Sequence, residues 1–195
     1  SEKMKNLAQI KLKSKNIQLI HPSVDLKIFK PSPVKKGILI PSVPYSLDQF
    51  EERGINLLLK YLAKSNIPAT MIFRSNEAYN YVKAKKISGL TLVNRTLSDK
   101  ELAKMMSKSK IVPILYSKNA PDMPLSAIEG LASGCAIICT KNMGISGVVK
   151  NNACGKVIKD ERGLGRAIDE GLKSKIYGQN ARNVAKRDFT EDNLK

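Results

Sequence analysis

The sequence predicts an α/β domain built on a doubly wound parallel sheet, and three observations support this prediction. Short apolar runs alternate with segments in which apolar residues recur at helical spacing. Each run is apolar throughout instead of at every second position, which is typical of strands that helices cover on both faces. The number of runs fits six strands in the order 3-2-1-4-5-6, the arrangement of Rossmann-like domains.

The expected strands and helices alternate along the chain. We expect strands at residues 36–43, 69–74, 90–93, 110–116, 135–140 and 156–158. We expect helices at residues 54–65, 76–86 and 125–134, and one or two further surface helices between 163 and 187. Ser98 and Glu101 have the spacing of a capping box, which predicts that one more helix begins between the third and fourth strands.

A sheet of this order binds ligands where the strand order reverses, at the carboxyl ends of the first and fourth strands. Residues 44–54 and 117–130 follow these two strands and should face each other across one crevice. Pro124 suits the first position of the helix in the second segment. The backbone N–H groups after it, including those of Leu125 and Ser126, would be free at the positive end of the helix dipole. This predicts a phosphate site.

Charged and flexible residues of the same two segments fit such a ligand. Arg53 can pair with phosphate, and Gly54 beside it lets the backbone approach a ligand closely. Glu129 is the single charged residue of a helix that is otherwise small and apolar. A carboxylate at that position can accept two hydrogen bonds from ribose hydroxyl groups. Spacing alone favours the other interpretation, that Glu129 is a surface residue of the helix.

The charge of the chain narrows the class of partner. Its 34 lysine and arginine residues against 17 acidic residues give a net charge of +17, which attracts nucleic acid, anionic lipid or phosphorylated small molecules. Aromatic residues make up 5% and tryptophan is absent, so nucleic acid is not favoured as a partner. A solvated, lysine-rich surface and a membrane-surface role both remain open.

Other features of the sequence favour a cytoplasmic protein. No apolar run reaches the roughly 18 residues of a membrane-spanning helix, and the first residues lack the apolar core of a signal peptide. The three cysteines are an odd number, which suits a reducing compartment. The single histidine and the absence of a carboxylate cluster at ligand spacing predict no metal site.

Several segments, in order, resemble the group 1 (family 4) glycosyltransferases of the GT-B fold. The segment DMPLSAIEGLASGCAIICTKNMGISGVVKNNACGKVI, residues 122–158, is similar to the signature region of that family. The other similar segments are SEKMK at the start, HPSVDLKIFKPSP (21–33), ERGINLLLKYL (52–62), LSDKELAKMMSKSKIVPILYS (97–117) and AKRDFTEDNL (185–194).

The resemblance implies the C-terminal, nucleotide-sugar-binding half of such an enzyme. Residues 1–35 would be the interdomain linker and the segment that leads into this half, and residues 36–188 the Rossmann-like donor-binding domain. Residues 189–195 would start the closing C-terminal helix. The N-terminal acceptor domain is expected to lie outside this chain, so the isolated chain is expected to be inactive.

The resemblance also implies an activity of the hexosyltransferase type. A sugar would pass from a nucleotide-sugar donor to a glycan or lipid-linked acceptor in polysaccharide or glycolipid biosynthesis. The mechanism would be retaining, with no metal and no other cofactor. The expected partners are the nucleotide sugar, the N-terminal acceptor domain and an anionic membrane surface. The expected location is the cytoplasm, peripheral at the inner face of the membrane.

Individual residues take roles through the same resemblance. Glu129 matches the glutamate that holds the ribose hydroxyl groups, and Arg53 matches the basic residue that stabilises the leaving diphosphate. Leu125 and Ser126 match backbone positions that approach the donor.

Other positions depart from the family pattern. Pro121 stands eight residues before Glu129, where the family has its first glutamate. Asp122, one residue later, is a candidate for the sugar contact that this glutamate makes. The segment after the first strand lacks the family's glycine-arginine pair, and Arg74 after the second strand is a candidate replacement as a phosphate contact.

These departures leave two alternative functions open. The chain can be a degenerate, non-catalytic homologue that binds a nucleotide or a glycan, which the proline at position 121 suggests. It can also be an anion-binding or nucleic-acid-binding α/β module, which the charge of +17 suggests.

Overall fold

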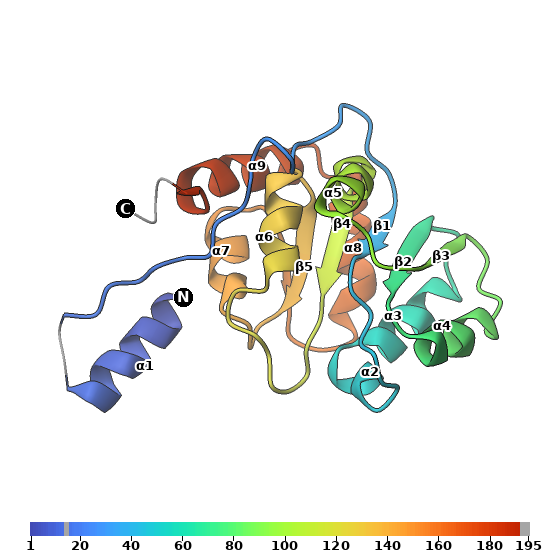
Figure 1. Cartoon of the computed structure of the whole chain (residues 1–195), viewed down its shortest axis with the longest axis horizontal. Helices are drawn as coiled ribbons and strands as arrows, with labels where there is room; N and C mark the ends of the chain where they lie inside the picture. Colours follow the sequence, from blue (N-terminus) through green and yellow to red (C-terminus); the bar gives the residue numbers. More distant parts are fainter. Residues whose placement is uncertain (14–15, 192–195) are drawn as a thin grey trace.

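The computed structural model of the chain describes residues 1–13 and 16–191 and contains one six-stranded sheet. All strand pairs are parallel, and the order β3-β2-β1-β4-β5-β6 confirms the predicted topology (Figure 1). The strands are β1 (Ile38–Ile40), β2 (Ala69–Phe73), β3 (Leu90–Asn94), β4 (Ile111–Ile114), β5 (Ala136–Thr140) and β6 (Gly155–Ile158).

Helices cover both faces of the sheet, as the uniformly apolar strands predict. The described helices are α1 (Glu2–Leu12), α2 (Gln49–Glu52), α3 (Ile55–Leu62), α4 (Asn76–Lys83), α5 (Asp99–Lys108), α6 (Leu125–Ala132), α7 (Ile145–Asn151), α8 (Gly163–Lys173) and α9 (Tyr177–Asp188). Helices α3, α4 and α8 pack on one face, and α5, α6, α7 and α9 on the other.

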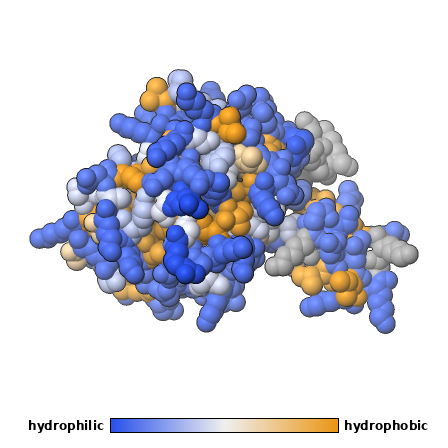
Figure 2. All heavy atoms as spheres, turned by 180° about the vertical axis from the view of Figure 1, so that it is seen from behind, coloured by the Kyte–Doolittle hydropathy of each residue, from blue (hydrophilic) through white to orange (hydrophobic). Residues whose placement is uncertain are grey.

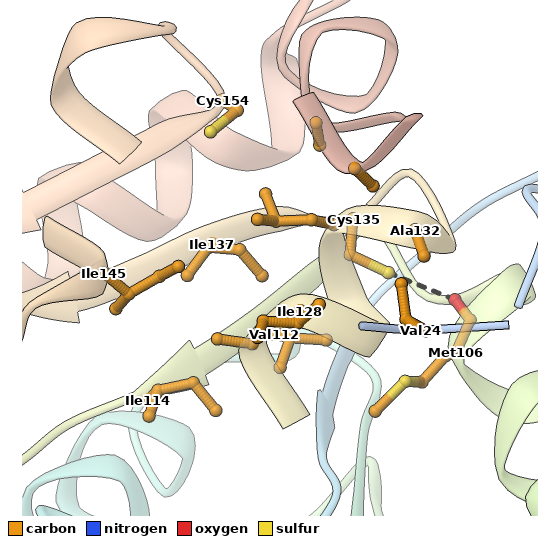
Figure 3. Close-up of a cluster of buried hydrophobic side chains, with 14 of the residues drawn as sticks. Val24, Met106, Val112, Ile114, Ile128, Ala132, Cys135, Ile137, Ile145 and Cys154 are labelled. Carbon is orange, nitrogen blue, oxygen red and sulfur yellow. Dashed lines mark hydrogen bonds between the residues drawn. The ribbon is translucent and has the colours of Figure 1, made fainter. Parts of the chain in front are cut away.

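Strand β5 shows how the two hydrophobic layers share one strand. Ile137 and Cys139 point into the layer beneath α6, whereas Ala136 and Ile138 point into the opposite layer, because successive side chains of a strand alternate between faces. Figure 3 shows the first layer, in which the Cys135 thiol donates to the Met106 carbonyl at 3.2 Å. Burial raises the pKa of Cys139 to about 12, so this thiol stays protonated and serves as a small core residue.

The predicted helices form, but three further helices occupy segments that were expected to be irregular. Helix α1 lies in the expected linker of residues 1–35, α2 lies within residues 44–54 after β1, and α7 lies between β5 and β6, where no helix was expected. Helix α2 has four residues and buries only Phe50. Helix α7 is anchored by Ile145 and Val149, which lie four residues apart and therefore on one helical face.

The position of Pro124 corrects one expectation. Pro124 has an extended ψ of 134°, so it is the N-cap and Leu125 is the first helical residue. The Pro124 carbonyl accepts from the N–H of Ala127 at 3.0 Å and from that of Ile128 at 3.3 Å. The N–H of Ala127 is therefore used within the helix. Only Leu125 and Ser126 keep backbone N–H groups that have no partner among the described residues.

The segment before β1 packs against the end of α9. The Val24 N–H donates to the Phe189 carbonyl at 2.9 Å, which joins the segment before β1 to the end of α9. Phe189 is buried and is the C-cap of α9, and the expected start of a closing helix in residues 189–195 stays a prediction. Residues 192–195, on which most of that expectation falls, lie outside the described residues. The domain boundaries at 35 and 188 stay predictions.

Candidate functional site

A small cavity lies at the carboxyl ends of β1 and β4, where the strand order reverses. Pro41 and Ser42 line it after β1, and Tyr116 lines it after β4. Arg53, at the end of α2, and Ser126, in the first turn of α6, complete its polar lining. The sheet therefore brings the segments after β1 and β4 together, as the strand order predicts.

Arg53 is held at this cavity by an aromatic ring. Its guanidinium carbon lies 5.0 Å from the centroid of the Tyr116 ring, within the range of a cation–π contact. Burial raises the pKa of Tyr116, and the positive charge of Arg53 opposes this rise. Among the residues that the structure describes, no carboxylate forms an ion pair with Arg53. The charge of Arg53 is therefore not neutralised by a carboxylate and can attract an anion.

Backbone contacts fix the two segments on which Arg53 and Tyr116 lie. The Ser117 N–H donates to the Glu52 carbonyl at 2.8 Å, which ties α2 to the loop after β4. The Thr140 hydroxyl donates to the Tyr116 carbonyl at 2.8 Å and accepts from the Tyr116 N–H at 3.2 Å. The sequence-based site did not include Tyr116 or Thr140. The one feature of the sequence that could have indicated Thr140 is its position as the polar last residue of an otherwise apolar strand.

Gly54 lies beneath Arg53 and has a structural role. Its φ of 63° is left-handed, and a Cβ atom there would lie 2.5 Å from the Leu115 Cβ atom. The close approach that requires glycine is therefore to the core of the protein. Gly130 in α6 is likewise required by close packing against the core, because a Cβ atom added there would lie 2.9 Å from Cδ1 of Ile137 in β5.

Glu129 lies one turn after Ser126 on the same face of α6. Burial raises the pKa of the Glu129 carboxyl group, Asp99 at the start of α5 raises it further, and Arg74 after β2 lowers it. Glu129 is therefore close enough to Asp99 and Arg74 to feel their charges, but it does not line the cavity of Arg53 and Ser126. No ion pair forms between Glu129 and Arg74, and both side chains keep hydrogen-bonding capacity among the described residues.

Asp122 is separated from this group. Its carboxylate accepts from the Ser1 hydroxyl at 2.6 Å and pairs with the Ser1 amino group, and its carbonyl accepts from the Ile145 N–H at 2.9 Å. Asp122 does not line the cavity of Arg53 and Ser126. The structure therefore brings Arg53 and Ser126 to one crevice, leaves Glu129 one turn further along α6 outside its lining, and turns Asp122 toward α1 and α7.

No group of three or more histidine, cysteine, aspartate or glutamate side chains is placed to hold a metal ion within residues 1–13 and 16–191. Over the same residues, every helix is too short or too polar to span a bilayer.

Comparison with solved structures places the fold among glycosyltransferases. Sucrose-phosphate synthase from Thermosynechococcus elongatus aligns with a TM-score of 0.73 at 18% identity, over 96% of this chain and 53% of that chain. A glycosyltransferase from Rickettsia africae aligns with a TM-score of 0.72 at 17% identity, over 100% of this chain and 59% of that one. Anabaena HepE in complex with UDP aligns with a TM-score of 0.72 at 13% identity, over 96% of this chain and 58% of that chain.

This chain thus spans a little over half the length of these structures. A search of curated proteins finds no match. The model of the family described as "Glycosyl transferases group 1" matches residues 45–188, which is most of the chain and includes every residue that lines the crevice except Ile40, Pro41 and Ser42. The chain therefore belongs to the group 1 glycosyltransferases.

Proposed function

We propose that this chain is the donor-binding domain of a hexosyltransferase that uses a nucleotide sugar. The observation that carries the proposal is that Arg53 and Ser126 line one crevice, at the end of α6 where the backbone N–H groups of Leu125 and Ser126 have no partner among the described residues. A cation without an acidic partner and a helix N-terminus together suit a diphosphate. The family membership and the UDP complex of Anabaena HepE support this class of ligand.

Each residue then has a role in the transfer. Negative charge grows on the diphosphate as it leaves the sugar, and Arg53 stabilises that charge in the transition state. Glu129 accepts hydrogen bonds from the ribose hydroxyl groups, and Arg74 beside it is a second phosphate contact. Asp122 stays a candidate for a sugar contact, which would require it to leave Ser1. The reaction is proposed to retain anomeric configuration and to use no metal or other cofactor, since cationic and N–H donors neutralise the leaving group.

The acceptor is proposed to be a glycan or a lipid-linked glycan, bound by an N-terminal domain. Structural neighbours are nearly twice as long as this chain, which supports a second domain as a partner. The chain alone should bind a nucleoside diphosphate and transfer no sugar. Robust transfer by the chain alone would contradict this part of the proposal.

Association with an anionic membrane at the cytoplasmic face is also proposed. Hydrophilic side chains cover most of the face seen in Figure 2. Two surface hollows of about 500 and 460 Å³ lie near the amino ends of the strands and share Pro31 and Ser32. Their lining includes no acidic residue and eight basic ones, namely Lys35, Lys110, Lys175 and Arg182 in the first and Lys27, Lys30, Lys100 and Lys104 in the second. Such surfaces attract anionic headgroups.

A non-catalytic nucleotide-binding homologue is the second candidate, because Pro121 occupies the position of the family's first glutamate. Calorimetric titration with the diphosphates and diphosphate sugars of uridine, guanosine and adenosine tests the main proposal. We expect one nucleotide series to bind. Salt-sensitive binding of an oligonucleotide without binding of any nucleotide sugar would instead favour an anion-binding module.

A further inference from the structure

Strand β6 is an edge of the sheet, and a hollow of about 530 Å³ lies along it. Within the described residues, β6 pairs with β5 on one side and has no neighbouring strand on the other. Residues of β6, of α7 and of the loops after β5 and β6 line the hollow, together with Tyr177 at the start of α9. The hollow shares no lining residue with the cavity of Arg53 and Ser126, and none of the roles proposed above uses it.

The backbone of β6 turns polar groups toward this open edge. The Ile137 N–H donates to the Cys154 carbonyl at 3.1 Å, and the Lys141 N–H donates to the Ile158 carbonyl at 3.2 Å, so both carbonyls point toward β5. Because the backbone polar groups of successive strand residues point alternately to the two sides of a strand, the N–H and C=O of Val157 point to the open edge. Val157 also lines the hollow. An open edge of this kind is a template on which an extended peptide can add a strand.

Three lysines beside the open edge have no acidic partner. Lys141, Lys150 and Lys159 line the hollow and are exposed, and none of them forms an ion pair within residues 1–13 and 16–191. Lys156 differs from them, because its side chain pairs with Glu170 of α8. Among the described residues that line the hollow, none is acidic. The hollow is therefore complementary in charge to a ligand that carries carboxylates.

Lysines beside an open strand edge also prevent a protein from pairing with copies of itself. They do so here, because a second copy of the chain would bring its own net charge of +17 to the same edge. They do not exclude an extended segment with acidic residues, whose carboxylates would compensate the unpaired lysines. An ionised phosphate group would also meet the lysines, but it has no N–H or O–H with which to donate to the Val157 carbonyl.

We propose that β6 binds an acidic, extended segment of a partner protein as a seventh strand of the sheet. The backbone of the segment pairs with the open N–H and C=O of Val157, and its carboxylates pair with Lys141, Lys150 and Lys159. Main-chain hydrogen bonds hold the segment in this mode of recognition, and the charged side chains select it. The proposal does not depend on the nucleotide-sugar site, which lies at the carboxyl ends of β1 and β4.

Calorimetric titration with two peptides of about ten residues, the length of a long strand, tests the proposal. The first peptide alternates glutamate and threonine, so its carboxylates lie on one face when it is extended. The second carries the same glutamates with proline in place of each threonine, which keeps the charge but removes backbone donors and prevents regular strand pairing. The first peptide should bind the chain at least about tenfold more tightly than the second.

Two variants separate the contribution of the backbone from that of the charge. Val157→Pro removes the N–H that points to the open edge, at a place where an edge strand tolerates proline, and should weaken binding of the first peptide about tenfold. Lys150→Glu should weaken binding of both peptides by roughly three- to tenfold. Lys64→Glu makes the same charge change at an exposed residue after α3 and should weaken either peptide by less than about twofold. Urea denaturation checks that each variant is folded.

Equal affinity for the two peptides would overturn the proposal, because the open strand edge would then contribute nothing. Equal losses for Lys150→Glu and Lys64→Glu would overturn it as well, since net charge alone would then explain the binding. If neither peptide binds and Lys150→Glu instead lowers binding to anionic lipid vesicles, the hollow contacts a membrane and the proposal is wrong. If Val157→Pro does not fold, the two peptides and the two lysine variants still decide the question. Failure of the chain to bind a nucleoside diphosphate would contradict the proposed function and leave this inference standing.

Discussion

At the amino ends of the strands, two partly buried cations donate to backbone carbonyls, whereas Arg53 and Arg74 at the carboxyl ends donate to no backbone carbonyl among the described residues. Lys35 donates to the Ser109 carbonyl at 2.9 Å and Arg182 donates to three carbonyls. Arg53 contacts the ring of Tyr116, and Arg74 is exposed. Neither of these two forms an ion pair within the part of the chain that the structure describes. A guanidinium whose donors are satisfied by the protein stabilises the fold, and one whose donors are open can bind an anion.

Arg182 is the strongest case of the first kind, and its removal should have the largest effect on stability. It donates to the carbonyls of Phe29, Ala132 and Leu26 at 2.6, 2.7 and 3.2 Å, so it joins the segment before β1 to α6 and α9. Arg182→Ala should lower the free energy of unfolding by about 3 kcal/mol, because it leaves acceptors without partners and removes charge-assisted bonds. Urea denaturation measures this change.

The control for this prediction is Lys186→Ala, an exposed residue of the same helix, which should change the stability by less than about 0.5 kcal/mol. Nucleotide affinity, measured well below the denaturation midpoint, should be the same in both variants. A loss of stability under about 1 kcal/mol for Arg182→Ala would show that its three bonds contribute little to the fold.

Arg53 is the opposite case, and its removal should affect binding and leave the fold intact. Arg53→Ala should weaken the binding of a nucleoside diphosphate about ten- to a hundredfold, the cost of losing roughly 1.5 to 3 kcal/mol of charged hydrogen bonding. It should spare the bare nucleoside, which has no phosphate. Calorimetry with both ligands measures the difference. Lys60→Ala, an exposed residue near the end of α3, should be nearly silent, and equal binding by both variants would place the site elsewhere.

The sheet and the crevice were predictable from sequence, because their signals are local and repeated. Parallel strands covered on both faces are apolar at every position, and their order fixes which loops meet. Helix α2 was missed because it buries only Phe50, so it has no periodicity to read. In α7, Gly147 and Ser146 lie between its two buried residues and favour the interpretation as a loop.

Contacts between distant segments were not predictable in this way. Arg182 lies on a polar helix, where spacing predicts a solvated side chain, and its three acceptors come from segments far apart in the sequence. The Tyr116 ring beneath Arg53 is equally non-local. Nothing in the residues around Asp122 indicates that Ser1 contacts it. Local sequence patterns therefore predict where the crevice lies, whereas only the structure shows which groups contact each charged side chain.

Glu129 offers a smaller effect and a dependence on pH. Glu129→Gln should weaken both the nucleoside and the nucleoside diphosphate about tenfold, because the ribose is common to them. Burial raises the pKa of Glu129, so its carboxylate gains a proton at a higher pH than usual as the pH falls. Wild-type affinity should therefore fall between neutral pH and the usual carboxyl range, and the Gln variant should lack this dependence.

The same shift sets the sign of the effect on stability. Since the folded state holds the Glu129 proton more tightly than the unfolded state, ionisation of this group lowers stability as the pH rises past the ordinary carboxyl pKa. Glu129→Gln should therefore leave the free energy of unfolding at pH 7 unchanged or slightly higher. A clear loss of stability at pH 7 would mean that the carboxylate supports the fold and is not reserved for a ligand.

The smallest expected effect concerns the exposed lysines of the amino-end hollows, which differ from Lys35 and Arg182 in having open donors. Lys104→Gln should lower binding to vesicles that contain anionic lipid by roughly fivefold or less, because one lysine near such a surface contributes about 1 kcal/mol. Co-sedimentation at low salt measures binding. Lys64→Gln makes the same charge change at an exposed residue just after α3, outside either hollow, and should have a weaker effect. Wild-type binding that is equal for neutral and anionic vesicles, or equal losses in the two variants, would show that net charge or apolar contact governs association and that the hollows do not select the lipid.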